Sequence, residues 1–410
     1  MASRKLTLVA TQLLAAALAV VPAPRVHAGS TYKVLHNFGS GQDGSLPYGP
    51  PLLDKKGNVY GVTFNGGTGK CSDYGCGAVF ELIRSRNGWS EKLLHSFTSA
   101  EGSPWGPLIY DQAGNVYGTS VGGPISNSEV FELSPTSNGW SFSALYTDGA
   151  GPGVVLDRVG NVYGAIGPGN YYGIGAIGEL SPGSQGWTYT DLGNFNPTVG
   201  YAPPAPPVWD TKGNLYGTTH YGGIGRPKCT TSFGCGVIFR VASNHDGTWT
   251  YQVLHRFASY PADGQNPLGG LVMDASGNFY GTTEGGGPSG AGTVFKFAFV
   301  NGHWRKTVLY GFPDCADGCI PGSTPVLDKA GNLYGAASGG NQGCGPDPCG
   351  TIFKLSPHKN GKWSYSVLHR FSGPDGNFPW GVVVDGKGNI FGTTESGGTY
   401  NAGTAFEITP

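Results

Sequence analysis

Hydrophobic and polar residues alternate in many short segments of the chain, and turns rich in glycine, asparagine and aspartate separate these segments. Tyr251, Val253 and His255 share the period of two that is typical of a β-strand. Other segments are short apolar runs that contain one charged residue, such as residues 237–241 and 351–355. The pattern predicts an all-β protein that is assembled from many short strands.

One eight-residue phrase, Asp-x-x-Gly-Asn-apolar-aromatic-Gly, occurs seven times. An aspartate in a turn can accept backbone N–H bonds, and a glycine such as Gly57 can adopt the positive φ of a hairpin turn. The phrase therefore predicts a tight hairpin between two strands. Its copies begin at Asp54, Asp111, Asp157, Asp210, Asp274, Asp328 and Asp385.

Each repeat offers four strands, which we name a to d. Strand a precedes the phrase, strand b follows it, strand c contains the charged residue, and strand d shows the alternation. The seventh repeat stops after strand c at residues 406–408, but residues 32–38 match strand d of residues 251–257 at Tyr, Val, Leu, His and Phe. We predict a seven-bladed β-propeller with four-stranded blades, whose ring is closed when the N-terminal strand d joins the C-terminal strands a to c.

The N-terminal 28 residues are typical of a signal peptide. Arg4 and Lys5 precede an apolar run from Leu6 to Val21, and Val26-His27-Ala28 supplies small residues for cleavage. A membrane anchor is the alternative, because the run approaches the shortest spanning length of about 17 residues. Since prolines precede a good cleavage motif, we expect residues 1–28 to be removed. Residues 29–410 then form one propeller domain without a membrane span, secreted or at the cell surface, with the periplasm as an alternative compartment.

Eight cysteines occur as four close pairs. In an exported chain this pattern predicts disulfides, and the alternative of a zinc site is less favoured because the intervals vary and no histidine lies at ligand spacing. The pairs are Cys71/Cys76, Cys229/Cys235, Cys315/Cys319 and Cys344/Cys349.

Composition excludes several classes of protein. Among 410 residues, 73 are glycine and only 12% are charged, and the formal net charge is -1. This glycine content is unsuited to a helical bundle. The net charge shows no excess of basic residues, which a nucleic-acid-binding protein would need. No phosphate-binding loop, His-Glu-x-x-His motif or nucleophile elbow is present. We expect a monomer with no cofactor and no metal site.

Histidines recur at the same place in strand d of four repeats, and we expect them to be structural because a catalytic residue is needed only once. For the same reason we interpret the seven turn aspartates as folding signals and not as calcium ligands. These histidines are His36, His95, His255 and His369.

The series Asp-x-x-Gly-Asn-x-Tyr-Gly-Thr-Thr, Gly-Gly, Gly-Thr-Val-Phe-Lys and Val-Leu-His-x-Phe resembles the GloVer tandem repeat of exported bacterial choice-of-anchor proteins. Residues 274–297 and 249–257 carry the resemblance most clearly, and it covers nearly all of residues 31–410. It implies an exported repeat protein. It carries over no catalytic residues.

The long d-to-a and b-to-c loops lie on one face of the predicted ring, and this face holds all eight cysteines. Its d-to-a loops repeat the phrase acid-Gly followed by Pro-aromatic-Gly in three blades that ring closure makes consecutive. Aromatic faces beside carboxylates suit the binding of sugars, although aromatics that pack between blades are the alternative interpretation. The predicted ligand-binding residues are Tyr48, Trp105 and Trp380 with Asp43, Glu101 and Asp375.

These observations favour an exported, non-catalytic propeller that binds a ligand, with a polysaccharide as the best candidate. One alternative is a carbohydrate-active hydrolase or lyase, since glycoside hydrolysis needs two carboxylates. The other is a scaffold that holds a surface protein through the b-to-c loops. The weak catalytic candidates are Glu284, Glu395, Asp263 and Asp375.

Overall fold

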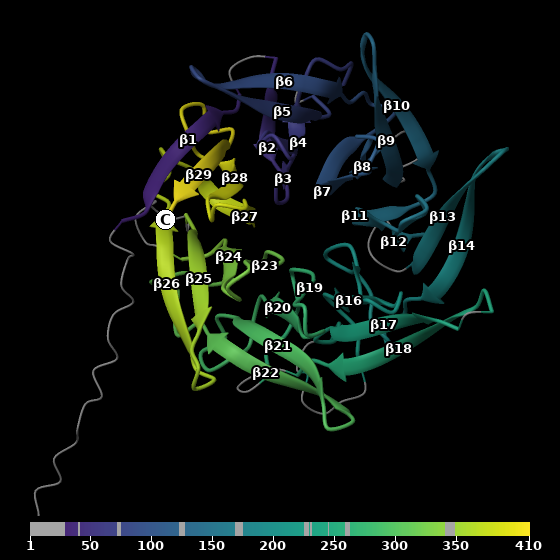
Figure 1. The fold of residues 1–410 in the computed structure, drawn as a ribbon, viewed down its shortest axis with the longest axis vertical. Coiled ribbons are helices and arrows are strands. Elements are labelled where there is room, and N and C mark those ends of the chain that lie inside the picture. Colours follow the sequence, from purple (N-terminus) through teal and green to yellow (C-terminus); the bar gives the residue numbers. More distant parts are fainter. Residues whose placement is uncertain are drawn as a thin grey trace, which may run out of the picture.

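The computed structural model describes residues 29–39, 42–71, 75–122, 128–168, 175–224, 229, 232–244, 246–258, 263–340 and 349–410. These residues contain no helix, and hence none that could cross a membrane. Their strands form seven antiparallel sheets arranged around a ring (Figure 1). The predicted seven-bladed β-propeller is confirmed. The predicted signal peptide lies outside the described residues.

Each blade runs from strand a beside the central opening to strand d at the outside (Figure 1). Blade 1 consists of β2 (Gly44–Pro47), β3 (Leu52–Leu53), β4 (Val59–Gly66), β5 (Ala78–Ser85) and β6 (Gly88–Ser96). Blade 2 consists of β7 (Ser103–Tyr110), β8 (Val116–Val121), β9 (Ser128–Thr136) and β10 (Gly139–Tyr146). Blade 3 consists of β11 (Ala150–Leu156), β12 (Val162–Ile166), β13 (Ala176–Gly183) and β14 (Gly186–Asn194). Blade 4 consists of β15 (Val208–Trp209), β16 (Leu215–Thr219), β17 (Val237–Ser243) and β18 (Trp249–Arg256). Blade 5 consists of β19 (Val272–Met273), β20 (Phe279–Thr283), β21 (Thr293–Val300) and β22 (His303–Gly311). Blade 6 consists of β23 (Val326–Leu327), β24 (Leu333–Ala337), β25 (Thr351–Pro357) and β26 (Trp363–Arg370).

Blade 7 joins the two ends of the described chain. Its sheet order is β1 (Thr31–Asn37), β29 (Thr404–Thr409), β28 (Ile390–Ser396) and β27 (Asn377–Val384). Val34 pairs directly with Phe406, and Tyr32 pairs with Ile408. The N-terminal strand therefore supplies strand d of the last blade, as the sequence predicts.

The repeated phrase forms the expected turn. Asp54 Oδ1 accepts the backbone N–H groups of Lys56 and Asn58, both at 2.8 Å, and Asn58 Nδ2 donates to Asp54 Oδ2. Gly57 adopts a φ of 85°. In all seven copies the aspartate accepts the N–H of the asparagine four residues later, so these carboxylates are used to hold the turns.

The hydrophobic core lies between neighbouring blades. Phe38, which follows β1 of blade 7, is fully buried, and its ring centroid is 4.9 Å from that of Phe80 in β5 of blade 1. Its cluster also contains Phe391 of blade 7 and Leu82 of blade 1. The closing strand is therefore fixed by side-chain packing as well as by its backbone pairing with β29.

We predict that Phe38→Ala lowers the free energy of unfolding by about 3–5 kcal/mol, because it opens a cavity in the closing interface. Phe299→Ala is the matched control, since Phe299 is 60% exposed. Denaturant unfolding of both variants measures the difference. Equal, small effects would show that the N-terminal strand is not docked in solution.

Candidate functional site

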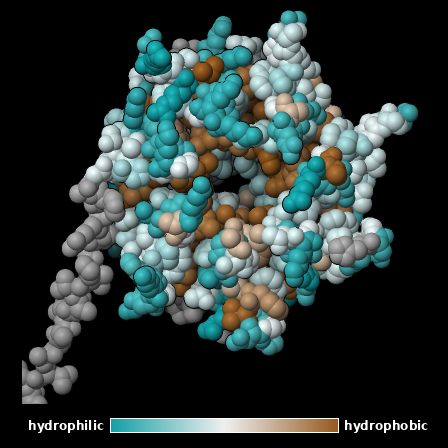
Figure 2. Space-filling model, in the orientation of Figure 1, coloured by the Kyte–Doolittle hydropathy of each residue, from teal (hydrophilic) through white to brown (hydrophobic). Residues whose placement is uncertain are grey.

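A cavity of about 340 Å³ opens at the centre of the ring, on the face that carries the d-to-a loops. Tyr48, Trp105 and Trp380 all line it, and so do His220 and Tyr221. We call this cavity the hub pocket. On the face that Figure 2 shows, hydrophobic residues gather around the central hollow of the ring and hydrophilic residues lie mostly around the periphery. The structure thus brings the three predicted aromatic residues, from three consecutive blades, to a single site.

The three aromatic side chains are half-buried. Tyr48 packs against Trp380 across the interface between blades 1 and 7, with ring centroids 4.1 Å apart. Burial raises the pKa of Tyr48 to about 12, and the nearby charge of Glu395 acts in the same direction. Trp105 has no ring partner among the described residues, and its buried indole N–H has no hydrogen-bond acceptor there. Part of this surface therefore packs the blades together, and Trp105 is the ring least engaged in that packing.

The glycine of the Pro-aromatic-Gly phrase allows the inner strands to approach at the centre. Gly106 has a φ of 81°, and a Cβ atom built on it would lie 3.0 Å from the backbone nitrogen of Gly153 in the next blade. Gly49 meets the backbone of Gly106 at a similar distance. A side chain at either position would push adjacent blades apart, so the phrase places the aromatic residues and also closes the wall of the hub pocket.

We predict that Gly106→Ala destabilises the protein more than Gly114→Ala does. Both glycines have positive φ, but a Cβ atom at Gly114 meets nothing within 4 Å. Gly114→Ala therefore reports the left-handed backbone alone, about 1–2 kcal/mol. The close approach should add about 1–3 kcal/mol at Gly106. Thermal or denaturant unfolding provides the measurement, and equal losses would contradict the blade contact.

The predicted acidic residues have a different position. Asp43, Glu101, Asp263 and Asp375 each lie 2.9–3.2 Å from the Nε2 atom of the strand-d histidine that precedes them in the same repeat. Each carboxylate also accepts a backbone N–H at the start of its d-to-a loop. None of these four belongs to the described residues that line the hub pocket.

These histidine–acid pairs explain why the histidines recur. The histidine is fixed at the end of strand d, and the acid returns from the loop to hold both the imidazole and the backbone. The acid follows the histidine by six to eight residues, for example His369 and Asp375 or His255 and Asp263. This spacing of six to eight residues is the sequence signal for the histidine–acid pairs.

Asp375 provides a pH test of this structural role. Burial raises its pKa, but hydrogen bonds from His369 and Ser372 outweigh burial, so the pKa is lower than that of an ordinary aspartate. A lowered folded-state pKa stabilises the protein above the unfolded value, and this contribution is lost as the pH falls through the folded value. We predict that stability falls less steeply below about pH 4 in Asp375→Asn than in the wild type. Parallel curves in denaturant unfolding across this range would refute the pairing.

The two candidate catalytic glutamates contact different parts of the wall. Glu284 Oε2 lies 3.7 Å from His220 Nε2, and His220 Nδ1 is 3.1 Å from the carbonyl oxygen of Pro267. Burial lowers the pKa of His220, while Glu284 opposes this change. Glu395 is near Tyr48 and Trp380 instead, and burial raises its pKa. His220 and Glu284 occupy equivalent positions after strand b in the adjacent blades 4 and 5. This equivalence is the sequence signal for their contact, which the sequence prediction did not include.

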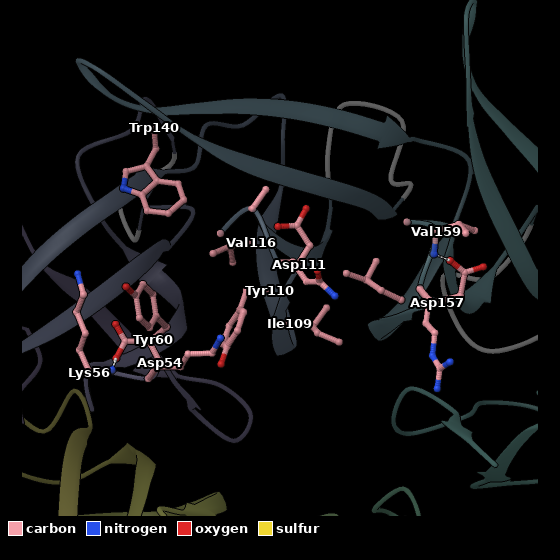
Figure 3. A pocket seen from close by; sticks show the side chains of 17 residues that line it. Asp54, Lys56, Tyr60, Ile109, Tyr110, Asp111, Val116, Trp140, Asp157 and Val159 are labelled. Atoms are coloured by element: carbon pink, nitrogen blue, oxygen red, sulfur yellow. Dashed lines mark hydrogen bonds between the residues drawn. The ribbon is translucent and has the colours of Figure 1, made fainter. Parts of the chain in front are cut away.

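A larger cavity, of about 1070 Å³, lies among the a-to-b turns of blades 1 to 3 (Figure 3). Asp54, Asp111 and Asp157 border it, but their carboxylates already accept hydrogen bonds within their own turns. Tyr110 and Trp140 supply its apolar surface. Lys56 and Arg158 also line this cavity, so its wall is more polar than that of the hub pocket. We favour the hub pocket because it gathers the three predicted aromatic residues.

Three of the predicted disulfides are confirmed. Cys71–Cys76 and Cys229–Cys235 bridge b-to-c loops, and Cys315–Cys319 bridges the d-to-a loop between blades 5 and 6. Cys349 is disulfide-bonded, and its predicted partner, Cys344, lies outside the described residues. The bridges stand on the face that contains the hub pocket.

Ring, blade topology and central pocket together define a seven-bladed β-propeller. Residues 224–410 match the model of the Gloeobacter/Verrucomicrobia repeat, and the resemblance to the GloVer repeat is confirmed there. A comparison with curated protein sequences finds no match.

Several solved structures are similar to this chain at low sequence identity. An ancestral GH74 enzyme is 10% identical, with a TM-score of 0.51 over 89% of this chain and 50% of that chain. A candidate 6-phosphogluconolactonase from Bacteroides uniformis is 14% identical, with a TM-score of 0.47 over 77% of this chain and 84% of that chain. A protein of unknown function from Dyadobacter fermentans is 12% identical, with a TM-score of 0.41 over 93% of this chain and 100% of that chain. The likeness to the GH74 enzyme concerns the fold alone.

Proposed function

We propose that this protein is an exported, non-catalytic β-propeller that binds a polysaccharide in the hub pocket. The convergence of Tyr48, Trp105 and Trp380 on one cavity is the observation that carries the proposal. Ligand pockets combine apolar and aromatic walls with a few polar groups that fix orientation, and His220 and Tyr221 supply such groups here. Aromatic faces of this kind suit stacking on the apolar faces of sugar rings.

The size of the hub pocket limits what can enter it. Its volume of about 340 Å³ is near the lower end of the range for small-ligand sites, about 300–1,000 Å³. We therefore infer that a chain end or a single branch of the polysaccharide enters, and that the rest of the ligand lies across the surrounding loops. The disulfides limit the conformations of these loops and lower the entropy cost of binding.

Export is supported by the N-terminal segment and by the disulfides. Residues 1–28 have the composition of a signal peptide, and the disulfides persist best in an oxidising compartment.

The positions of the acids support binding over hydrolysis. Glycosidases place two carboxyl groups on either side of one glycosidic bond, about 5–9.5 Å apart. Glu284 contacts His220, whereas Glu395 lies near Tyr48, and neither glutamate is among the described residues that line the hub pocket. Asp263 and Asp375 are held by histidines and backbone groups.

Trp105→Ala tests the proposed site. Trp105 has no ring partner among the described residues, so its truncation should leave the packing of Tyr48 on Trp380 in place. We expect at least tenfold weaker binding of a polysaccharide identified on a glycan array, because buried aromatic residues dominate binding free energy. Calorimetric titration measures the affinity.

The control is Trp89→Ala, on the outer strand β6 and remote from the hub pocket. Unchanged affinity in Trp105→Ala, or an equal loss in Trp89→Ala, would reject the site. New reducing ends or unsaturated products during the incubation would contradict the non-catalytic part of the proposal.

A further inference from the structure

One position in each strand d reaches across to the preceding blade, and we call it the interblade position. In five blades it holds an aromatic ring, and in the other two it holds a lysine and a glutamate. The residues at the interblade position, in chain order, are Tyr32, Glu91, Phe142, Tyr189, Tyr251, Lys306 and Tyr365.

The aromatic residues make the same kind of contact. Tyr32 stacks on His369 of blade 6 with ring centroids 3.8 Å apart, and Phe142 stacks on His95 of blade 1 at 4.7 Å. Several tyrosines also donate their hydroxyl to a carbonyl of the preceding d-to-a loop, as Tyr32 does to Asp375 at 2.6 Å. The other contacts are Tyr189 on Tyr146, Tyr251 on Val199 and Tyr365 on Tyr310.

Lys306 differs in chemistry but complements its surroundings. Its Nζ atom lies 2.9 Å from Asp263 Oδ1 and also donates to the Asp263 carbonyl oxygen. The lysine thereby places a positive charge beside the half-buried His255–Asp263 pair. It offers donors where an acceptor-rich loop needs them, as the tyrosine hydroxyls do.

Glu91 breaks this pattern. It faces the His36–Asp43 pair of blade 7, and its Oε2 atom lies 3.8 Å from His36 Nε2. Its other oxygen, Oε1, is buried and has no hydrogen-bond partner among the described residues. The side chains of Glu91 and Asp43 are only 14% and 5% exposed. A second carboxylate therefore stands where every other blade presents a ring or a cation.

We propose that His36, Asp43 and Glu91 bind a divalent transition-metal cation of the zinc class. One ligand atom from each residue lies within 4.8 Å of the others. His36 Nε2 is 3.1 Å from Asp43 Oδ2 and 3.8 Å from Glu91 Oε2. These values bracket the separation of about 3.4 Å between ligand atoms around a tetrahedral zinc ion with bonds of about 2.1 Å.

The chemistry of the ligands also favours this class of cation. Imidazole nitrogen suits zinc and its neighbours in the first transition row, and three protein ligands leave a fourth position for water. A cation bound at Glu91 Oε2 offsets the repulsion between the two carboxylates. It would then act at this interface as Lys306 acts between blades 4 and 5.

The location gives the site a role in ring closure. His36 belongs to β1 and Asp43 follows it in the d-to-a loop, whereas Glu91 belongs to β6 of blade 1 (Figure 1). A bound cation would tie the closing strand to the first blade. Sequence reasoning expected no metal site, because these ligands come from strands that only the closed ring brings together.

Zinc titration of the EDTA-treated, dialysed protein tests the proposal by calorimetry and by thermal unfolding. We expect saturable binding of one zinc ion per chain and a higher unfolding temperature when zinc is present. Glu91→Gln should weaken zinc binding at least tenfold and remove the thermal response, because it replaces a charged ligand with a neutral amide.

Glu129→Gln is the matched control. Glu129 is also buried, and burial together with Glu101 raises its pKa to about 7, but it lies outside the His36 cluster. This variant should retain zinc binding. The proposal is overturned if zinc does not bind, if Glu91→Gln binds zinc as tightly as the wild type, or if calcium binds in place of zinc.

Discussion

The pairing of β1 with β29 is the constraint on which the rest of the molecule depends. It places Phe38 in the core between blades 7 and 1 and Tyr32 against His369 of blade 6. It also makes blades 7 and 1 neighbours, which brings Trp380 into contact with Tyr48. Without this closure the hub pocket would lose one side of its wall, and the His36–Glu91 contact would not form.

Function and scaffold use different parts of the same loops. At its outer end, each of four d-to-a loops is fixed by an acid that bonds a strand-d histidine, and at the inner end three of the seven loops present an aromatic residue to the hub pocket. The threonines of the Gly-Thr-Thr phrase add a third element, since Thr393 Oγ1 donates to the Gly49 carbonyl of the next blade. Strongly repeated residues thus build the ring, and the residues that vary between blades give the pocket its character.

Much of this organisation could be predicted from the sequence because repetition exposes it. Seven copies of one turn and a missing strand d at one end were sufficient for the fold and its closure, and the seven aspartates hold turns as expected. The side-chain partners were harder. Asp43 and Tyr48 are close in sequence, but the loop between them runs from the outside of the ring towards its centre, so the carboxylate and the ring face different surroundings. Contacts between blades, such as His220 with Glu284, depend on the rotation between neighbouring sheets, which a single sequence does not encode in any local pattern.

Closure by a strand from the opposite end also governs how the chain can fold. The hydrogen bond from Tyr32 to Asp375 joins residues 343 positions apart, so the contact order of this interface is very high. Such contacts form late and slowly, because the entropy of closing a long loop is lost before the contact stabilises the chain. The first strand of the ring to be synthesised stays unpaired until the last blade has emerged. The toroid can therefore close only after residues 404–409 have left the ribosome.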